Sequence, residues 1–443
     1  PTACQQMLSQ TESFNQELMT FLAKSPSPYH AVSNLAAMLS EAGFHQLDLE
    51  ATWQLAPNEA AFVTLNDASL IAFRLGSGPL QEQGIRMMGA HTDSPCLKVK
   101  PVPERYQHGC LQLSTEIYGG VLLAPWFDRD LSLAGRVTGR LADGTLRSGL
   151  VDFVRPIATV PNLAIHMNRE ANRNRTINPQ EEMVLMLATD SPETTLRELL
   201  LKQAQQEYPD VPWAEILDFE LCCYDQQAPS LVGLNEDFIA AARLDNLLSC
   251  FAGTKALVSG VGNEPTNLLA CYDHEEVGSL SAGGAQGPFL NAVLNRLAGP
   301  NQDLTGITQR SMLISVDNAH AVHPNYPDKH DAEHRPHING GPVIKINANQ
   351  RYATNSETAA VCRTLCREAD IPVQTIAVRS DMSCGTTIGP ITAAELGVRT
   401  MDVGVPQLAM HSPRELTGSK DPVRLYRALQ VFLSKAAPLI SRP

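Results

Sequence analysis

Apolar residues at the start of the chain recur with a helical period and then give way to shorter runs. Residues 14–22 place apolar side chains at helical spacing, residues 25–28 break the pattern, and a second amphipathic stretch ends at Gly43. The short runs that follow end with residues 85–90, which lead directly into the polar cluster 91–93. We expect two opening helices and then strands, with the first reactive side chains at the end of a strand.

Between residues 98 and 234 the pattern changes to the alternation that is typical of half-buried strands. Residues 111–117 and 131–140 alternate in this way, and the Asp-Gly pair at 143–144 indicates a hairpin turn. One helix is expected at 194–206. We predict that this part of the chain is a separate, mostly β domain.

From residue 235 onward, helical patterns alternate with short apolar runs. These runs are typical of buried strands and cover residues 267–272, 311–316, 373–378 and 398–403. The pattern returns to that of the first hundred residues. We therefore predict one α/β domain with a mixed sheet covered by helices, built from residues 1–97 and 235–443 and interrupted by an inserted β-rich domain at 98–234.

Composition narrows the class of protein and its partners. The 443 residues are 43% hydrophobic and 18% charged, as in ordinary globular proteins. The formal net charge of −13 disfavours nucleic acid and anionic lipid as partners. No apolar run reaches the ~18 residues of a membrane-spanning helix, and the polar start does not resemble a secretory signal. The ten cysteines are scattered, which favours reduced thiols and a cytoplasmic location.

The polar residues that follow predicted strands are the main candidates for chemistry. Ligands of open α/β sheets bind beyond the carboxyl ends of the strands. The candidates at or near such positions are His91, Thr92, Asp93, Asp273, His274, Glu275, Glu276 and Asp317, together with Asp245 at a predicted helix start and His411 late in the chain.

Two of these clusters contain pairs with a chemical logic. Asp93 follows His91 by two residues, so its carboxylate can accept the proton of the imidazole nitrogen that does not bind metal. Adjacent Glu275 and Glu276 would repel each other after a buried strand unless cations or different roles separate them. One can bind metal while the other removes a proton from water. The pair in isolation also fits a solvated turn, and the helical zinc-protease motif is incomplete because glycine replaces its second histidine.

Taken singly, Asp245 and Asp317 fit helix caps at the edge of a core. Taken with His91, His411 and Glu276, they supply two histidines and three carboxylates. That set suits two zinc ions, each with one histidine, one terminal carboxylate and a share of a bridging carboxylate. A single structural zinc needs fewer ligands.

The ordered motifs resemble the aspartyl aminopeptidase family of di-zinc peptidases, whose relatives include the yeast vacuolar aminopeptidase. The resemblance covers essentially the whole chain and is carried by the motifs at residues 89–95, 126–131, 243–246, 273–279, 320–326, 340–345 and 380–385. It implies a metallo-aminopeptidase that removes the first residue of a short peptide. It also implies roles for the candidates: His91, Asp245, Glu276, Asp317 and His411 as zinc ligands with Asp245 bridging, Glu275 as general base, and Asp93 orienting His91.

The mechanism expected from this resemblance is attack by a hydroxide shared between two zinc ions, with cobalt or manganese as possible substitutes for zinc. Glu275 would pass the proton to the leaving amine. The resemblance further implies that the insertion makes dimers, which assemble into a tetrahedral dodecamer with an internal chamber. His166 from the insertion would reach a neighbouring subunit's site and stabilise the oxyanion, although a metal-binding role for it stays open. From the residues alone, a lone histidine after an apolar run is more often a packing residue.

The resemblance also suggests the substrate pocket. Lys345 would pair with an acidic first residue, aspartate or glutamate, with a broader preference left open. The residues alone also fit an edge-strand charge that faces water. Tyr352 and Met382 would be its neighbours, and His320 and His323 would shape the pocket.

Two alternative functions remain at this point. A di-zinc N-acyl amino acid deacylase or a dipeptidase would use the same metal core. A noncatalytic assembly or cargo protein would keep the fold without the chemistry, although the intact Glu275 and all five candidate ligands favour an enzyme.

Overall fold

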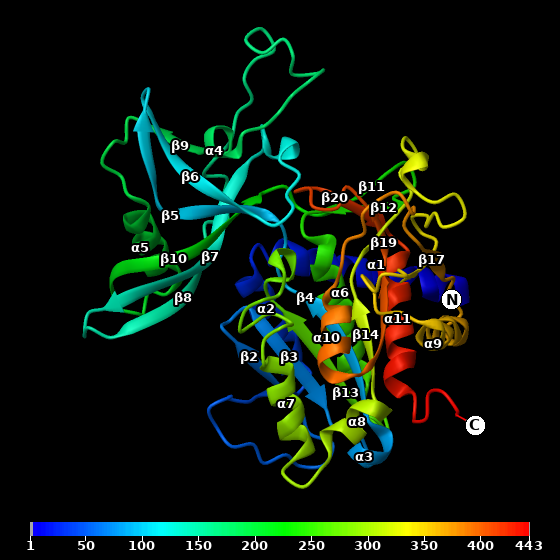
Figure 1. The fold of residues 1–443 in the computed structure, drawn as a ribbon. Helices are drawn as coiled ribbons and strands as arrows, with labels where there is room; N and C mark the ends of the chain where they lie inside the picture. The colour runs from blue at the N-terminus through cyan, green and yellow to red at the C-terminus, as the bar shows by residue number, and fades with distance from the viewer. Residues whose placement is uncertain (1–2, 443) are drawn as a thin grey trace.

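A computed structural model describes residues 3–442 of the chain. Its centre is a mixed nine-stranded sheet (Figure 1). In spatial order the strands are β1 (His45–Gln46), β2 (Ala60–Leu65), β3 (Ser69–Arg74), β13 (Thr266–Tyr272), β4 (Ile85–His91), β14 (Met312–Val316), β18 (Arg399–Gly404), β16 (Val343–Lys345) and β17 (Gln374–Ile376). The strands thus come from both ends of the sequence, as predicted.

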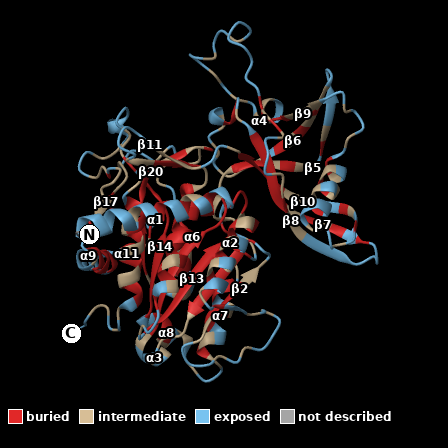
Figure 2. Ribbon diagram, turned by 180° about the vertical axis from the view of Figure 1, so that it is seen from behind, coloured by how far each residue is buried: buried red, intermediate tan, exposed pale blue. Residues whose placement is uncertain are grey.

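Helices cover both faces of this sheet. One face packs against α1 (Ala3–Ala23), α2 (Pro28–Glu41), α6 (Leu244–Ser259), α9 (Ser356–Glu368) and α11 (Asp421–Ser434). The other packs against α7 (Phe289–Ala298), α8 (Leu304–Arg310) and α10 (Ile388–Leu396), and the short α3 (Leu80–Gln83) lies beside α8. Successive side chains of β4 point to opposite faces of the sheet. Met88 packs in the core beneath α1, α2, α6, α9 and α11, and Met87 packs in the core beneath α7, α8 and α10. Figure 2 shows the buried strands between helices whose outer surfaces are exposed.

The middle of the sheet explains why the polar clusters meet. Strands β13, β4, β14 and β18 are mutually parallel, so their carboxyl ends lie along one edge. Tyr272 pairs with His91 in the register of β13 and β4. Asp273 follows β13 directly, and Asp317 follows β14. Residues far apart in sequence therefore share this edge.

The insertion forms a sheet of its own. Its antiparallel strands are, in spatial order, β8 (Leu146–Asp152), β7 (Leu131–Leu141), β10 (Trp213–Asp225), β5 (Cys96–Gln107), β6 (Cys110–Tyr118) and β9 (Leu185–Thr189). The helix α5 (Leu196–Glu207) packs on this sheet through Leu200. The hydrophobic core between them also includes Leu133 and Trp213. The short elements η1 (Ala124–Trp126) and α4 (Pro179–Glu182) belong to the same region. Figure 1 shows this sheet projecting to one side of the central one.

The α/β architecture with an additional β-rich sheet is confirmed, and the helix predicted at 194–206 is α5. The boundaries at 97/98 and 234/235 and the dimerisation role of the insertion stay predictions. The sequence did not predict a third, small sheet. It consists of β11 (Ser230–Val232), β12 (Phe238–Ala241), β20 (Glu415–Gly418), β19 (Pro406–Leu408) and β15 (Ala319–His320).

The remaining short elements are η2 (Glu275–Val277) and η3 (Pro327–Lys329). Across residues 3–442, none of the helices combines the length and the apolar character needed to cross a membrane.

Candidate active site

The five predicted metal ligands converge at the carboxyl edge of the central sheet. His91 ends β4, Asp245 lies in the first turn of α6, and Asp317 follows β14, while Glu276 lies in η2 and His411 between β19 and β20. The two carboxylate oxygens of Asp245 face the two imidazoles: Oδ1 is 3.2 Å from His91 Nε2, and Oδ2 is 3.1 Å from His411 Nε2. Asp245 is thus the centre of the cluster.

The cluster divides into two groups around Asp245. One contains His91, Asp245 and Asp317, and the other contains Asp245, Glu276 and His411; within each group the potential ligand atoms lie within 4.8 Å of one another. His91, Glu275 and Glu276 form a third combination under the same limit. Each Asp245-centred group has one histidine and one further carboxylate, which is the composition expected for a pair of zinc ions.

Two buried atoms support a metal between them. His91 Nε2 and Asp245 Oδ1 have no hydrogen-bond partner, although both residues are buried. Buried polar atoms are almost always paired, so two acceptor atoms that face each other without a hydrogen bond are the arrangement expected around a cation. Two tetrahedral ligands at ~2.1 Å from one zinc ion lie about 3.4 Å apart. The observed 3.2 Å between these atoms fits that spacing.

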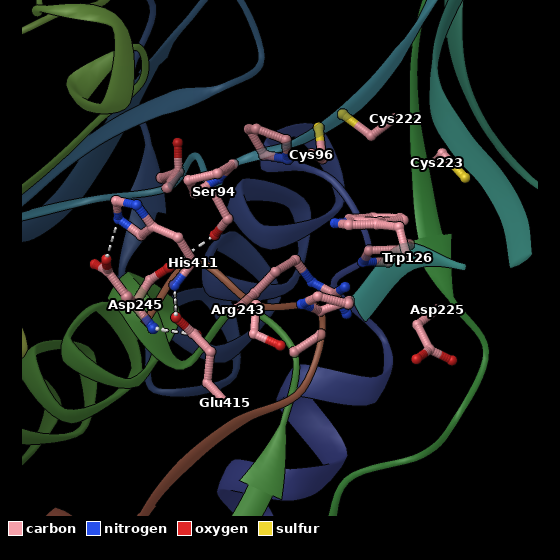
Figure 3. Close-up of a pocket in the computed structure, with 17 residues that line it drawn as sticks. Ser94, Cys96, Trp126, Cys222, Cys223, Asp225, Arg243, Asp245, His411 and Glu415 are labelled. Atoms are coloured by element: carbon pink, nitrogen blue, oxygen red, sulfur yellow. Dashed lines mark hydrogen bonds and ion pairs between the residues drawn. The ribbon is translucent and has the colours of Figure 1, made fainter. Parts of the chain in front are cut away.

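The backbone around Asp245 is held by a buried carboxylate that sequence reasoning missed. Glu415, in β20, accepts hydrogen bonds from the backbone N–H of Asp245 (3.1 Å) and of His411 (2.8 Å). Ser94 Oγ donates to the Asp245 carbonyl at 2.9 Å. Figure 3 shows Asp245, His411 and Glu415 side by side. One carboxylate therefore fixes two candidate ligands that are 166 residues apart in the chain.

Asp93 adopts the geometry that the sequence predicted. Its Oδ1 is 3.2 Å from His91 Nδ1, and its backbone carbonyl is 3.0 Å from the same nitrogen. Both neighbours are acceptors, so Nδ1 carries the proton and Nε2 is free for metal. The Asp93 carboxylate also accepts the backbone N–H groups of Glu275 (3.2 Å) and Glu276 (3.0 Å) and the hydroxyl of Tyr118 (2.7 Å).

The pKa values of the cluster follow from burial and mutual charge. Burial raises the pKa of Glu275 to about 9 and that of Glu276 to about 7, with further increases from neighbouring carboxylates. Burial alone would lower the pKa of His411, but the hydrogen bonds that it donates to Asp245 and Glu276 raise the pKa to about 11. The histidine partners outweigh the burial of Asp245 and lower its pKa. The metal-free cluster therefore holds protons in place of cations.

A pocket of about 530 Å³ opens in front of the cluster. Its lining includes Glu275, Lys345, Tyr352 and His320. Lys345 is 3% exposed, so it is not a surface charge on an edge strand. Its Nζ donates to the Asn318 carbonyl at 2.8 Å and lies 5.4 Å from the centre of the Tyr352 ring. Lys345 thus places a basic side chain in the lining of the same pocket as the carboxylates.

Three other predicted residues do not line this pocket in the described chain. His323 packs against Tyr326 instead, with ring centres 4.8 Å apart. Met382 is exposed and lies three residues before Gly385, which does line the pocket. His166 is exposed in the insertion. Their roles stay predictions.

The site also contains residues without a recognisable sequence signal. Glu415 follows His411 by four residues, and Tyr118 ends an ordinary-looking strand. Thr386 and Thr387 line the pocket from the segment before α10. Tyr118 and Glu415 each bond a residue distant in the chain, Asp93 and Asp245, so local pattern did not distinguish them from structural residues.

Histidines and carboxylates at the carboxyl edge of an α/β sheet, with a carboxyl group beside them and an open pocket, define a metal-dependent hydrolase. The chain belongs to the M18 family of zinc aminopeptidases. The model of that family, described as aminopeptidase I zinc metalloprotease (M18), matches residues 21–433. The resemblance of the motifs to this group of peptidases is thereby confirmed.

Individual relatives agree over nearly the whole chain. The probable M18 family aminopeptidase 2 of Ectopseudomonas mendocina is 56% identical over 425 residues, which covers 96% of this chain and 98% of the relative. A chain of the cryo-EM structure of the Ape4 and Nbr1 complex is 37% identical, with a TM-score of 0.92, covering 96% of this chain and 86% of that one. The S. cerevisiae mApe1 dodecamer is 29% identical, with a TM-score of 0.83 and coverage of 94% and 95%.

Proposed function

We propose that this chain removes the N-terminal residue of short peptides with two zinc ions centred on Asp245. The observation that carries the proposal is that Asp245, which lines the pocket, joins two ligand groups, each with its own histidine. A single metal would leave one histidine group without a cation to balance its carboxylates. His91 with Asp317 would hold one ion, and His411 with Glu276 the other.

Glu275 is the residue placed for proton transfer. Its Oε2 lies 3.7 Å from His91 Nε2, and it lines the pocket without belonging to either Asp245-centred group. Zinc, when bound, lowers the pKa of water and polarises a carbonyl group. Bound cations would also bring the pKa of Glu275 down from about 9, so that its carboxylate takes a proton and returns it to the leaving amine.

Lys345 supports a preference for an acidic first residue. The ammonium is buried and held by the Asn318 carbonyl, so it cannot turn away to water. An aspartate or glutamate side chain in the pocket would form a charge-assisted hydrogen bond with it. A neutral first residue would not form this hydrogen bond, so we expect a lower rate with such substrates.

We also propose a homo-oligomer, a dodecamer built from dimers, in the cytoplasm. The solved mApe1 dodecamer supports the assembly. The loop around His166 exposes Leu163, Ile165 and Met167, apolar side chains that an interface would cover. His166 would then act on a neighbouring subunit's substrate. The cysteines are free, which supports a reducing compartment.

A panel of aminoacyl substrates on protein loaded with defined metals tests these proposals. We expect two zinc ions per chain, and highest kcat/KM for aspartyl and glutamyl substrates. Peptides with an acetylated amino terminus should not be cleaved. Cleavage of the acetylated series would instead identify a deacylase, and one bound ion at saturation would contradict the two-metal site.

Lys345→Met is the variant that tests the source of specificity. It should reduce the preference for acidic over neutral first residues by removing the cationic partner, without loss of bound zinc. Lys100→Met, which removes another partly buried lysine outside the pocket lining, is the control for specificity. An unchanged acidic preference in Lys345→Met would exclude Lys345 as the specificity residue.

A further inference from the structure

We propose that the segment Tyr118 to Leu122, which begins at the end of β6 within the insertion, positions both metal-binding histidines. The proposal rests on the metal-dependent function above and adds a role for the insertion within its own chain. The Tyr118 side chain contacts Asp93, which bonds His91. The backbone of the segment contacts His411 directly.

The contact on the His91 side passes through Asp93. The Tyr118 hydroxyl donates to Asp93 Oδ2 at 2.7 Å, and the other oxygen of that carboxylate faces His91 Nδ1 at 3.2 Å. Lys98 Nζ lies 4.5 Å from the centre of the Tyr118 ring, so a neighbouring strand of the insertion fixes the ring by a cation–π contact. Tyr118 therefore orients the carboxylate that sets the tautomer and direction of His91.

The contact on the His411 side is direct. His411 Nδ1 lies 2.9 Å from the Gly120 carbonyl oxygen, which only accepts, so Nδ1 is the protonated nitrogen and Nε2 is left for metal. Leu122 N–H donates to the His411 carbonyl at 3.2 Å. The imidazole and the backbone of this residue are thus both held by the same segment.

Gly119 fits closely against a third candidate ligand. Its φ is +71°, and a methyl group at this position would lie 3.2 Å from Cβ of Glu276 and 3.3 Å from the Glu276 carbonyl oxygen. Glycine is therefore required for both the backbone conformation and the close approach. The segment Tyr118 to Leu122 contacts Asp93, Glu276 and His411, and the insertion completes the support of the metal centre.

Tyr118→Phe tests the His91 side because it removes only the hydroxyl. We expect zinc affinity and kcat to fall about tenfold, with KM within twofold of wild type, as for other partners that orient a metal ligand. The visible spectrum of the cobalt(II)-substituted protein should shift. Tyr224→Phe is the matched control, because it removes a buried tyrosine hydroxyl that bonds Asp152 within the same insertion. It should match wild type in all these measurements.

A double variant tests whether Tyr118 acts through Asp93. If it does, Tyr118→Phe/Asp93→Asn should bind zinc no more weakly than Asp93→Asn alone. Additive losses would contradict the proposed route. Wild-type zinc affinity, cobalt spectrum and kcat in Tyr118→Phe would overturn the role of Tyr118 while leaving the proposed function intact. A wild-type protein that binds no zinc would overturn both.

Gly119→Ala tests the His411 side. The control is Gly109→Ala, at the other end of β6, where φ is +78° and the space around the position is open. Both variants impose a similar backbone strain, but only Gly119→Ala displaces Glu276. We expect zinc affinity to fall at least tenfold more in Gly119→Ala than in Gly109→Ala. Equal affinities would overturn this part of the proposal.

Discussion

Charged side chains are buried at the carboxyl edge of the central sheet and exposed on the surface of the inserted sheet. At the edge, His91, Asp93 and Asp245 are 1%, 0% and 3% exposed. On the insertion, Arg140 and Glu215 form an ion pair at 2.7 Å with both side chains about half exposed. Buried charges without cations are costly, whereas exposed pairs contribute little. The charges at the edge thus need a partner to balance them, whereas the Arg140–Glu215 pair is already solvated.

Asp245→Asn should have the largest effect, since it removes the carboxylate that faces both histidines. We expect turnover at assay background, and a loss of zinc affinity greater than the ~10–100-fold that removal of an outer partner costs. Metal analysis after dialysis and a peptidase assay measure this. Retention of two zinc ions would show that Asp245 does not join the groups.

Glu275→Gln should remove the proton carrier and keep the metal site. A general base contributes ~10² to 10⁴ in rate, so kcat should fall by that factor with zinc content unchanged. Asp245→Asn should lose both zinc and turnover, whereas Glu275→Gln should lose turnover alone, so the two variants separate proton transfer from metal binding. A near wild-type kcat would exclude Glu275 as the base.

Glu415→Gln should have an intermediate effect, because it weakens the acceptor for the N–H groups of Asp245 and His411 without touching metal. We expect zinc affinity to fall about 10- to 100-fold. Chelator competition is the measurement. Glu104→Gln is a control on the insertion, where the carboxylate accepts one backbone N–H at 2.7 Å far from the edge, and it should leave zinc affinity unchanged.

Zinc binding to the metal-free protein should strengthen as pH rises. Hydrogen bonds donated to Asp245 and Glu276 outweigh burial and raise the pKa of His411 to about 11. The charge of Glu275 and hydrogen bonds to neighbouring aspartates likewise outweigh burial and raise the pKa of His91. These protons must leave before Nε2 can bind metal, so affinity should rise by up to about tenfold per pH unit for each released proton. Calorimetry in buffers of different ionisation enthalpy counts the protons. A pH-independent affinity would contradict this account.

Arg140→Gln should have the smallest effect. It breaks the exposed pair with Glu215 on the insertion, and such pairs contribute about 0.2–1 kcal/mol to stability. Thermal unfolding should shift only slightly, with zinc affinity unchanged. A large loss of zinc would show that the two regions are more strongly coupled than their contacts indicate.

The sequence alone predicted the α/β class, the inserted β region and the strand-end positions of His91, Glu276 and Asp317. These features are local, since hydrophobic periodicity and the residues that end helices and strands can be recognised within short windows of sequence. The five candidate ligands and Glu275 were also identified from residue type, position and motif resemblance. Their roles await the experiments above.

Only the tertiary structure decided how these residues combine. It paired Asp317 with His91 and Glu276 with His411 around Asp245, and it placed Tyr118 and Glu415 against them. Such contacts join segments separated by up to 291 residues, and their distances depend on strand order, register and helix packing. No local pattern encodes those distances, because each is a property of the whole folded core.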